Sequence, residues 1–316
     1  MNYKVKIFIT SYNQLEYLQE CVDSILCQKT NFPYQVIVSD NCSTDGTLEY
    51  LETVKKKYQD KFTYIVGKQN GGAYINLLRI FKLIDTEYFA LMCGDDFWIG
   101  EGRLQKQIDF LERNPQFSMC SGQTYFKKED EADSFLCPPL DYCNLGYTLS
   151  NYFYTPVLYH LSSIVYRNVL FKDGTFFKTF SDLYQSYLEW DENFIRLLHL
   201  EKGDLYALPE VVSCYRYSGK GLWSKLSKEE QAIENAIQTF YIYKFCRDRH
   251  PELREIMLKQ MQDYYQLMLA ALINNQVIYP KNTLSLEATE KLAYLLVEIK
   301  KDERFLELME VQNSYI

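Results

Sequence analysis

The chain has 316 residues, of which 24% are charged and 47% hydrophobic, and its formal net charge at pH 7 is −8. This length and composition suit a globular protein with a sizeable core, and the negative charge without a concentrated basic patch argues against nucleic acid as a partner. The nine cysteines are odd in number and never form a CxxC pair, which argues against a disulfide framework and a zinc site and favours the reducing cytoplasm.

Membrane-spanning segments are not expected. No apolar run approaches the roughly 18 residues that a spanning helix needs. The sequence begins directly with a strand pattern rather than with the charged and apolar regions of a secretory leader. We therefore expect a cytoplasmic protein, and a peripheral position at the inner face of the plasma membrane is left open.

The first hundred residues alternate between strand and helix patterns. Helical spacing of apolar residues follows each of the first three predicted strands, and Asn13 stands where it would cap the first helix. This order predicts parallel strands with right-handed crossovers and helices on both faces of the sheet. The predicted strands are Lys4–Thr10, Tyr34–Ser39, Phe62–Val66 and Tyr88–Cys93.

The fourth strand ends in the most informative motif of the chain. Tyr88–Cys93 has the length of a strand buried on both faces, and it is followed at once by Gly94, Asp95 and Asp96. In an open α/β sheet, ligands bind beyond the carboxyl ends of the strands, where the loops after the first, second and fourth strands should converge. An isolated Gly-Asp-Asp could be a solvated turn, but the convergence of three loops favours a site.

Two further loops bear on nucleotide binding. Asp40 directly follows the second strand, where its carboxylate could accept a hydrogen bond from a nucleobase N–H, and an Asx turn or helix cap is equally consistent. Asn70, Gly71 and Gly72 open a helix whose amides could face a diphosphate, although a plain glycine turn would look the same. The absence of GxxxxGK[ST] and GxGxxG argues against an ATPase or a dehydrogenase.

These motifs resemble those of a known family. Residues 3–120 resemble the family 2 glycosyltransferases of GT-A fold, and are most similar to the bacterial polysaccharide and capsule type, in the segments ITSYNQLEYLQECVDSILCQ, VIVSDNCSTDGT, NGGAYINLLRIF, YFALMCGDDFW and RLQKQIDFLERNP. Residues 201–224 (EKGDLYALPEVVSCYRYSGKGLWS) are similar to the family's closing strand and YRxHxxGxW segment. The implied fold is α/β, with a Rossmann-like mixed, mainly parallel sheet flanked by helices.

The resemblance implies roles for residues near the donor. Asp45 is expected to fix its loop rather than to touch substrate. Asn76 and Arg79 lie three residues apart on one helix face and could reach the donor, or Arg79 could be a solvated surface residue. The positions that match those holding the base and ribose are Thr10, Ser11, Tyr12 and Asp40.

The Gly-Asp-Asp segment matches the family's DXD-type motif. By that match Asp96 is the expected metal contact, Asp95 lies nearer the ribose and donor sugar, and Trp98 walls the pocket. The implied cofactor is Mg²⁺ or Mn²⁺, which carboxylates bind and which would neutralise the departing diphosphate. The chain departs from the pattern in two places: Cys93 stands where relatives usually have an acid, and Ser218 where the segment has its His. These departures remove two potential metal contacts.

The middle of the chain should supply the acceptor side. Asp191 and Glu192 lie some ten residues before Lys202 and match the family's catalytic base element. Neighbours on a helix diverge by about 100°, so only one can point into the cleft. We expect Asp191 to be the base with Glu192 as the alternative, and a solvated acidic pair is the third possibility. His160 could line the acceptor pocket or be structural.

The sequence predicts three regions. Residues 1–120 form the nucleotide-sugar-binding half of a GT-A domain, 121–224 its acceptor-binding half, and 225–316 a C-terminal helical extension. Tyr264–Ile273 is apolar nearly all round, which predicts a buried helix or a homodimer contact, with an interfacial membrane helix as the alternative.

The sequence thus predicts an inverting glycosyltransferase. It would move a sugar from a nucleoside diphosphate donor, expected to be a UDP-sugar, to a surface polysaccharide or its lipid-linked saccharide precursor. Cys93 and Ser218 motivate the alternative of a non-catalytic relative that binds a nucleotide sugar or a partner enzyme. A nucleotidyltransferase is a weaker third reading, because its Gly-rich N-terminal loop is missing. The donor sugar, the acceptor and the linkage are not specified by the sequence.

Overall fold

The computed structural model describes residues 2–128, 131–152, 159–172, 176–177, 192–217, 219, 221, 223–263 and 285–302. The chain divides into two compact units, residues 1–218 and 219–316, and each is described by itself. The predicted division of the catalytic domain into halves at residue 120 stays a prediction.

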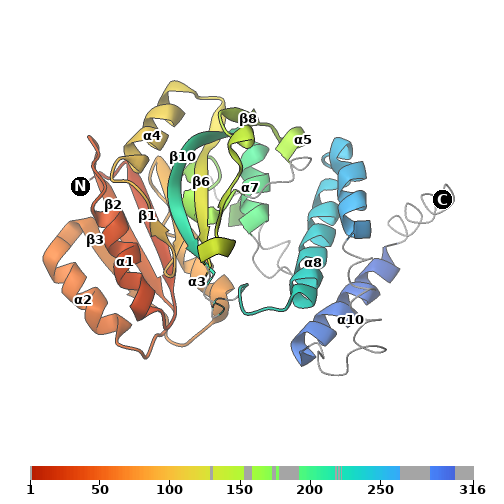
Figure 1. Ribbon diagram of the computed structural model, residues 1–316, viewed down its shortest axis with the longest axis horizontal. Helices are drawn as coiled ribbons and strands as arrows, with labels where there is room; N and C mark the ends of the chain where they lie inside the picture. The colour runs from red at the N-terminus through yellow and green to blue at the C-terminus, as the bar shows by residue number, and fades with distance from the viewer. Residues whose placement is uncertain are drawn as a thin grey trace. The chain divides into compact units, whose positions relative to one another are not determined.

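The first unit is a mixed sheet with helices on both faces (Figure 1). Its main elements, in chain order, are β1 (Val5–Ser11), α1 (Leu15–Leu26), β2 (Tyr34–Asp40), α2 (Thr47–Tyr58), β3 (Phe62–Val66), α3 (Gly72–Phe81), β4 (Tyr88–Cys93), β5 (Phe97–Trp98), α4 (Arg103–Arg113), β6 (Phe117–Lys127), β7 (Phe135–Cys137), β8 (Leu145–Tyr147), α5 (Leu149–Tyr152), η4 (Leu161–Ser163), β9 (Val165–Arg167), α7 (Glu192–Leu200) and β10 (Asp204–Arg216).

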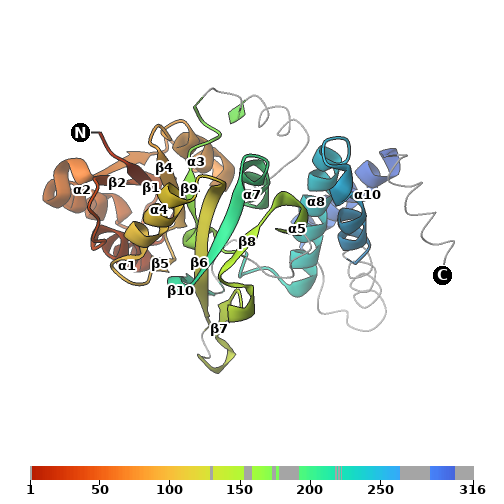
Figure 2. The ribbon, with the colours of Figure 1, turned by 90° about the horizontal axis from the view of Figure 1, so that it is seen from above.

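The strands follow the order β3-β2-β1-β4-β9-β6-β10-β5. β3, β2, β1 and β4 are mutually parallel, and β6 is parallel to β10. The short β9 is antiparallel to both β4 and β6 and joins the two parallel groups. Figure 2 shows β6 and β10 running side by side, with β8 along β10. The predicted mixed, mainly parallel sheet flanked by helices is confirmed, and the four predicted strands agree with the structure to within one residue at each end.

Apolar residues on both faces of the strands explain why helices cover both sides. Ile7 of β1 and Ala90 of β4 lie in one core that also contains apolar residues of α1, α2 and α4. The neighbouring residue Phe89 points to the opposite face, because successive side chains of a strand alternate, and its ring stacks on Tyr166 of β9 with centroids 4.9 Å apart. Strands buried on both faces read as continuous apolar runs, which is why the sequence predicted them well.

The first helix is capped differently from the prediction. Asn13 does not cap α1: its Oδ1 accepts from the backbone N–H of Thr44, at 2.8 Å. The cap comes instead from Asp45, whose Oδ2 accepts from the backbone N–H of Leu15 at 2.9 Å and whose Oδ1 accepts from Thr47. One carboxylate thus fastens the loop after β2 to the helix after β1.

The second unit is helical, with α8 (Lys228–Cys246), α10 (Leu286–Lys301) and a helical stretch over 254–263. Ser227 and Glu230 form a capping box at the start of α8, which fixes its first turn. Lys291 of α10 pairs with Glu234 of α8 at 2.8 Å. Tyr264–Ile273 lies outside the described residues, and the homodimer stays a prediction. Within the described parts of the chain, every helix is too short or too polar to cross a bilayer.

Candidate active site

The loops after β1, β2 and β4 meet at one edge of the sheet. Strand register pairs Ser11 with Asp40 and Thr10 with Cys93 at the carboxyl ends. Backbone hydrogen bonds continue beyond the strands, since Gly94 N–H donates to the Thr10 carbonyl at 2.8 Å. The predicted convergence is therefore present, and it brings the Gly-Asp-Asp segment beside the predicted nucleotide-binding residues.

Gly94 is needed for this close approach. A Cβ at this position would lie 3.1 Å from the Thr10 carbonyl oxygen and 3.2 Å from Leu18 Cδ1, both tighter than ordinary contacts. The glycine thus lets the chain leave β4 against β1 and turn Asp95 and Asp96 into the interior. Both side chains are buried, and that of Asp96 is 0% exposed.

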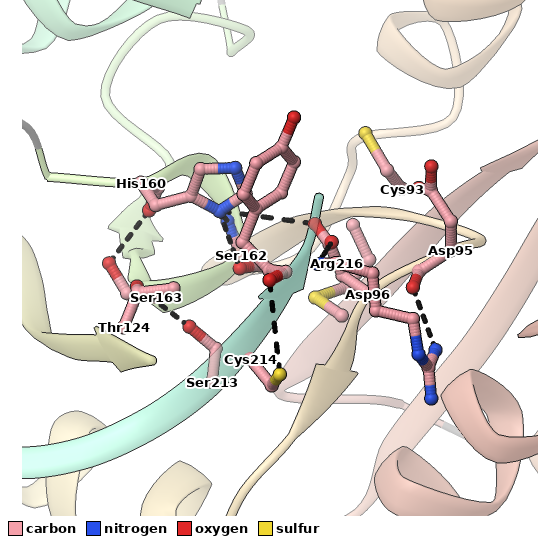
Figure 3. A network of polar contacts seen from close by, with 12 residues as sticks. Cys93, Asp95, Asp96, Thr124, His160, Ser162, Ser163, Ser213, Cys214 and Arg216 are labelled. Carbon is pink, nitrogen blue, oxygen red and sulfur yellow. Dashed lines mark hydrogen bonds and ion pairs between the residues drawn. The ribbon is translucent and has the colours of Figure 1, made fainter. Parts of the chain in front are cut away.

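The two oxygens of Asp96 have different surroundings (Figure 3). Oδ1 accepts from the backbone N–H of Arg216 at 3.3 Å, whereas Oδ2 is buried and has no hydrogen-bond partner among the residues that the structure describes. Burial raises the pKa of Asp96 well above its usual range, and the neighbouring Asp95 carboxylate raises it further. Burial also raises the pKa of Asp95. These buried carboxyl groups are therefore stable either in the protonated, neutral form or as carboxylates compensated by a nearby cation.

Arg216, at the end of β10, closes one side of the cluster. Its Nη1 donates to the Asp95 carbonyl at 2.8 Å, its Nη2 pairs with Glu20, and its guanidinium carbon lies 4.7 Å from the Phe97 ring centroid. Sequence reasoning did not single out Arg216. The signal available was its place in the matched YRxHxxGxW segment, directly after a predicted strand.

His160 lies on the other side of Asp96. Its Nδ1 is 3.9 Å from Asp96 Oδ2 and 2.7 Å from Ser162 Oγ (Figure 3). Burial lowers the pKa of His160 to about 4, so the imidazole is neutral at pH 7 and does not neutralise the acid. The loop that holds it is built on Arg103, whose Nη1 donates to the Ser162 carbonyl at 2.8 Å.

Trp98 belongs to the same scaffold. Its side chain is buried, its Nε1 donates to the Ser162 carbonyl at 3.0 Å, and the guanidinium carbon of Arg103 lies 3.9 Å from its ring centroid. These contacts hold the η4 loop against β5 and α4. The predicted pocket-wall role is untested, and the contacts define Trp98 as a support for the loop that carries His160.

The predicted base-binding residues differ in accessibility. Asp40 is fully buried, and its carboxylate accepts from Ser43 twice, at 2.8 Å from N–H and 2.5 Å from Oγ. The Oγ of Ser11, on the paired residue of β1, is buried and has no hydrogen-bond partner within the described ranges, whereas Tyr12 is 43% exposed. Thr10 Oγ1 donates to the Met92 carbonyl at 3.3 Å. Asp40 thus makes turn contacts of the kind that the sequence analysis gave as the alternative to base binding. Its contact with a base stays a prediction.

Asn76 and Arg79 are used within the fold. Asn76 is buried, its Oδ1 accepting from Ser39 Oγ at 2.5 Å and its Nδ2 donating to the Ser39 carbonyl at 2.8 Å. Arg79 Nη1 donates to Asn41 Oδ1 at 3.2 Å. Asn41 also bonds Asn70 at 2.6 Å, and it joins the loop after β2 to the glycine turn before α3. Sequence reasoning missed Asn41. The donor-binding roles of Asn76 and Arg79 stay predictions.

Glu192 opens α7 near the acidic cluster. Its carboxylate lies 3.4 Å from Nη1 of Arg196, one turn along the helix, and Arg196 Nη1 also donates to the Tyr159 carbonyl at 2.8 Å. After burial and Asp95, the charge of Glu192 is a further cause that raises the pKa of Asp96. Glu192 therefore acts electrostatically on the site, while Asp191 lies outside the described residues.

Three side chains could hold a cation. One ligand atom from each of Cys93, Asp95 and Asp96 lies within 4.8 Å of the others. Asp96 also carries the buried Oδ2, which has no hydrogen-bond partner among the described residues. Carboxylate oxygens suit Mg²⁺ and Mn²⁺, so the residues present fit the divalent cation implied by the sequence resemblance.

Solved structures and sequence relatives agree on the class. The structure of S. aureus TarS 1-349 in complex with UDP-GlcNAc aligns with TM-score 0.58 and 17% identity, covering 93% of this chain and 79% of that chain. The mannosyltransferase PcManGT from Pyrobaculum calidifontis, in complex with GDP-Man and Mn²⁺, aligns with TM-score 0.57 and 16% identity over 99% and 85% of the two chains. At these identities the likeness establishes the fold, which is that of the GT-A glycosyltransferases.

The family follows from the sequence comparison. The family model described as glycosyl transferase family 2 matches residues 6–172, more than half of the chain, and the chain belongs to this family. A Mycobacterium tuberculosis protein is 29% identical over 222 residues, covering 69% of this chain and 60% of that protein. TuaG of Bacillus subtilis, named for teichuronic acid biosynthesis, is 28% identical over 136 residues, 43% of this chain and 53% of TuaG. The chain thus spans less than two thirds of the length of these relatives.

Proposed function

We propose that the chain is an inverting glycosyltransferase. It transfers a sugar from a nucleoside diphosphate donor, a UDP-sugar, to a saccharide or lipid-linked saccharide in bacterial surface polysaccharide synthesis. The observation that supports this most is the buried Oδ2 of Asp96, at the carboxyl end of β4, for which the described part of the chain provides no hydrogen-bond partner. TarS with UDP-GlcNAc, PcManGT with GDP-Man and Mn²⁺, and the name of TuaG support the donor, the metal and the polysaccharide class.

The donor side is formed by the converging loops. Ser11 and Asp40 hold the base, because their polar atoms lie at the paired ends of β1 and β2. Asp96 would hold Mg²⁺ or Mn²⁺ at the diphosphate, and Asp95, which lies in the same group of potential ligands, would be nearer the ribose and donor sugar. When bound, the cation neutralises charge that develops on the leaving diphosphate. Gly94 and the backbone N–H of Arg216 fix the orientation of Asp96 for that contact.

The acceptor side needs a base on the opposite face of the sugar. Inversion by single displacement requires a carboxylate that takes the proton of the acceptor hydroxyl as its oxygen attacks. Asp191 is the proposed base and Glu192 the reserve. Arg196 orients the Glu192 carboxylate through the 3.4 Å ion pair, and its own position is fixed by the Tyr159 carbonyl. Asp95 and Asp96 lie on the leaving-group side in this arrangement.

Donor turnover tests the proposal. The purified chain is incubated with Mn²⁺ and a panel of UDP-, GDP- and dTDP-sugars, with and without saccharide acceptors, and nucleoside diphosphate release is measured. We expect release from a UDP-sugar that an acceptor accelerates, and an inverted anomeric centre by NMR. Asp85→Asn removes an exposed carboxylate outside the site and serves as the matched control for Asp96→Asn. Nucleotide binding by thermal shift without any release would instead establish the non-catalytic alternative.

A further inference from the structure

Cys93 occupies a position in the acidic cluster that differs from the other thiols of the fold. It is partly exposed, as Cys42 and Cys137 are, but it is the cysteine that lies in the group of potential metal ligands found among the described residues. Cys21 Sγ lies 3.7 Å from the Cys93 carbonyl oxygen, so this neighbouring thiol contacts the backbone of Cys93. The Cys93 sulfur lies with the Asp95 and Asp96 carboxylates, all three ligand atoms falling within 4.8 Å of one another.

This spacing is close to that of ligands around one ion. Metal–oxygen and metal–sulfur bonds of about 2.0–2.3 Å place two ligands on opposite sides of an ion about 4.5 Å apart. A second observation concerns Asp96 itself: its Oδ2 is buried and has no hydrogen-bond partner among the described residues, so a cation held by Asp96 would compensate a buried carboxylate. The guanidinium of Arg216 is occupied by Glu20 and by the Asp95 carbonyl.

We propose that the Cys93 thiolate is a ligand of the divalent cation at this site, and that it shifts the preference of the site from Mg²⁺ toward softer ions such as Co²⁺ and Zn²⁺. Thiolate sulfur selects softer metals, whereas an all-carboxylate set suits Mg²⁺ and Mn²⁺. On binding, the thiol releases its proton to solvent and the sulfur donates an electron pair to the cation. This inference rests on the metal-binding part of the proposed function. Cys93 would then contact the metal through sulfur, at the position where relatives usually have an acid.

Cobalt substitution reads the sulfur ligand directly. The full chain is titrated with Co²⁺, alone and with UDP, and its near-ultraviolet absorption is recorded. We expect a sulfur-to-cobalt charge-transfer band that Cys93→Ser abolishes. Cys27→Ser, which removes an exposed thiol whose Sγ donates to the Ser24 carbonyl, is the matched control and should retain the band. A band that persists in Cys93→Ser, or Co²⁺ binding without a band, would overturn the proposal.

A second variant tests the preference. Cys93→Asp replaces sulfur with a carboxylate, so Mg²⁺ affinity relative to Co²⁺ should rise by at least about tenfold, since even outer contacts of a metal site change affinity by 10–100-fold. An unchanged preference contradicts the proposal. If the variants fail to fold, cobalt X-ray absorption of the wild-type chain still decides whether sulfur is bound. None of these measurements depends on sugar transfer, so failure here and failure of the transferase assay are distinguishable.

Discussion

Replacing Asp40 with Ala separates nucleotide binding from loop anchoring. The buried carboxylate accepts from both the N–H and the Oγ of Ser43, so its removal leaves a buried N–H without its acceptor. A hydrogen bond to a charged group contributes about 1.5–3 kcal/mol, and we expect Asp40→Ala to lower the free energy of unfolding by roughly 3 kcal/mol. If Asp40 also accepts from the base, Asp40→Ala should in addition weaken the binding free energy of UDP by 1.5–3 kcal/mol, which is about a 10- to 150-fold loss of affinity.

Ser43→Ala is the control for this experiment. It removes the Oγ donor but keeps the carboxylate and its bond to the Ser43 N–H, so it should cost roughly 1 kcal/mol of stability. Unfolding free energies come from urea titrations, and UDP affinities from calorimetry at a temperature where circular dichroism shows both variants folded. We expect Ser43→Ala to keep nearly full UDP affinity. Equal losses of affinity in the two variants, or none in Asp40→Ala, would refute direct base binding by Asp40.

Three further predictions concern the metal, the base and the helix cap. Asp96→Asn keeps the acceptor for the Arg216 N–H but removes the charge, so calorimetry should show no Mn²⁺ enhancement of UDP binding by this variant. Full turnover by the unmodified chain in excess chelator would contradict the metal requirement. Asp191→Asn should lower turnover by about 10²–10⁴-fold with donor binding intact, and a collapse in Glu192→Gln instead would move the role to Glu192. Burial opposes the charge of Asp45, but hydrogen bonds from Thr47 and a backbone N–H outweigh it and hold its pKa below the usual value. Because this folded-state pKa is depressed, the stabilisation is present above the ordinary pKa and is lost as pH falls through the folded value. Asp45→Asn should therefore cost about 1 kcal/mol at pH 7, and urea titrations should show that difference shrinking below about pH 4; a difference independent of pH contradicts the mechanism.

The donor half of the sheet could be predicted because β1, β2 and β4 are buried on both faces, while the edge strand β3 is a short, mostly apolar run of mainly half-buried residues. Apolar runs predicted the bounds of β1, β2, β3 and β4 to within one residue. The turns after these strands follow from polar residues at the strand ends. The short β9 could not be predicted: it has three residues and no periodicity of its own. Its place between β4 and β6 depends on tertiary packing, which overrides local pattern.

The positions of the site residues were easier to predict than their contacts. Asp45 caps α1 although Asn13 is nearer to this helix in sequence, because the loop after β2 folds back onto α1. Asn76 lies on the expected helix but turns toward Ser39, since a buried amide needs partners. A hydrogen bond across two loops leaves no spacing signal in the sequence, so such partners follow only from the folded chain.

Asp96 shows how the motif and a distant segment share one task. The Gly-Asp-Asp turn buries the carboxylate, but the donor that fixes Oδ1 is the backbone N–H of Arg216, 120 residues later. A backbone donor leaves no residue signature, which is why the motif alone did not reveal it. With Oδ1 held in this way, Oδ2 is left buried with no hydrogen-bond partner among the described residues. Asp96 lies in one cluster with Asp95 and Cys93, and a cation bound by this cluster would compensate the cost of burying the carboxylate.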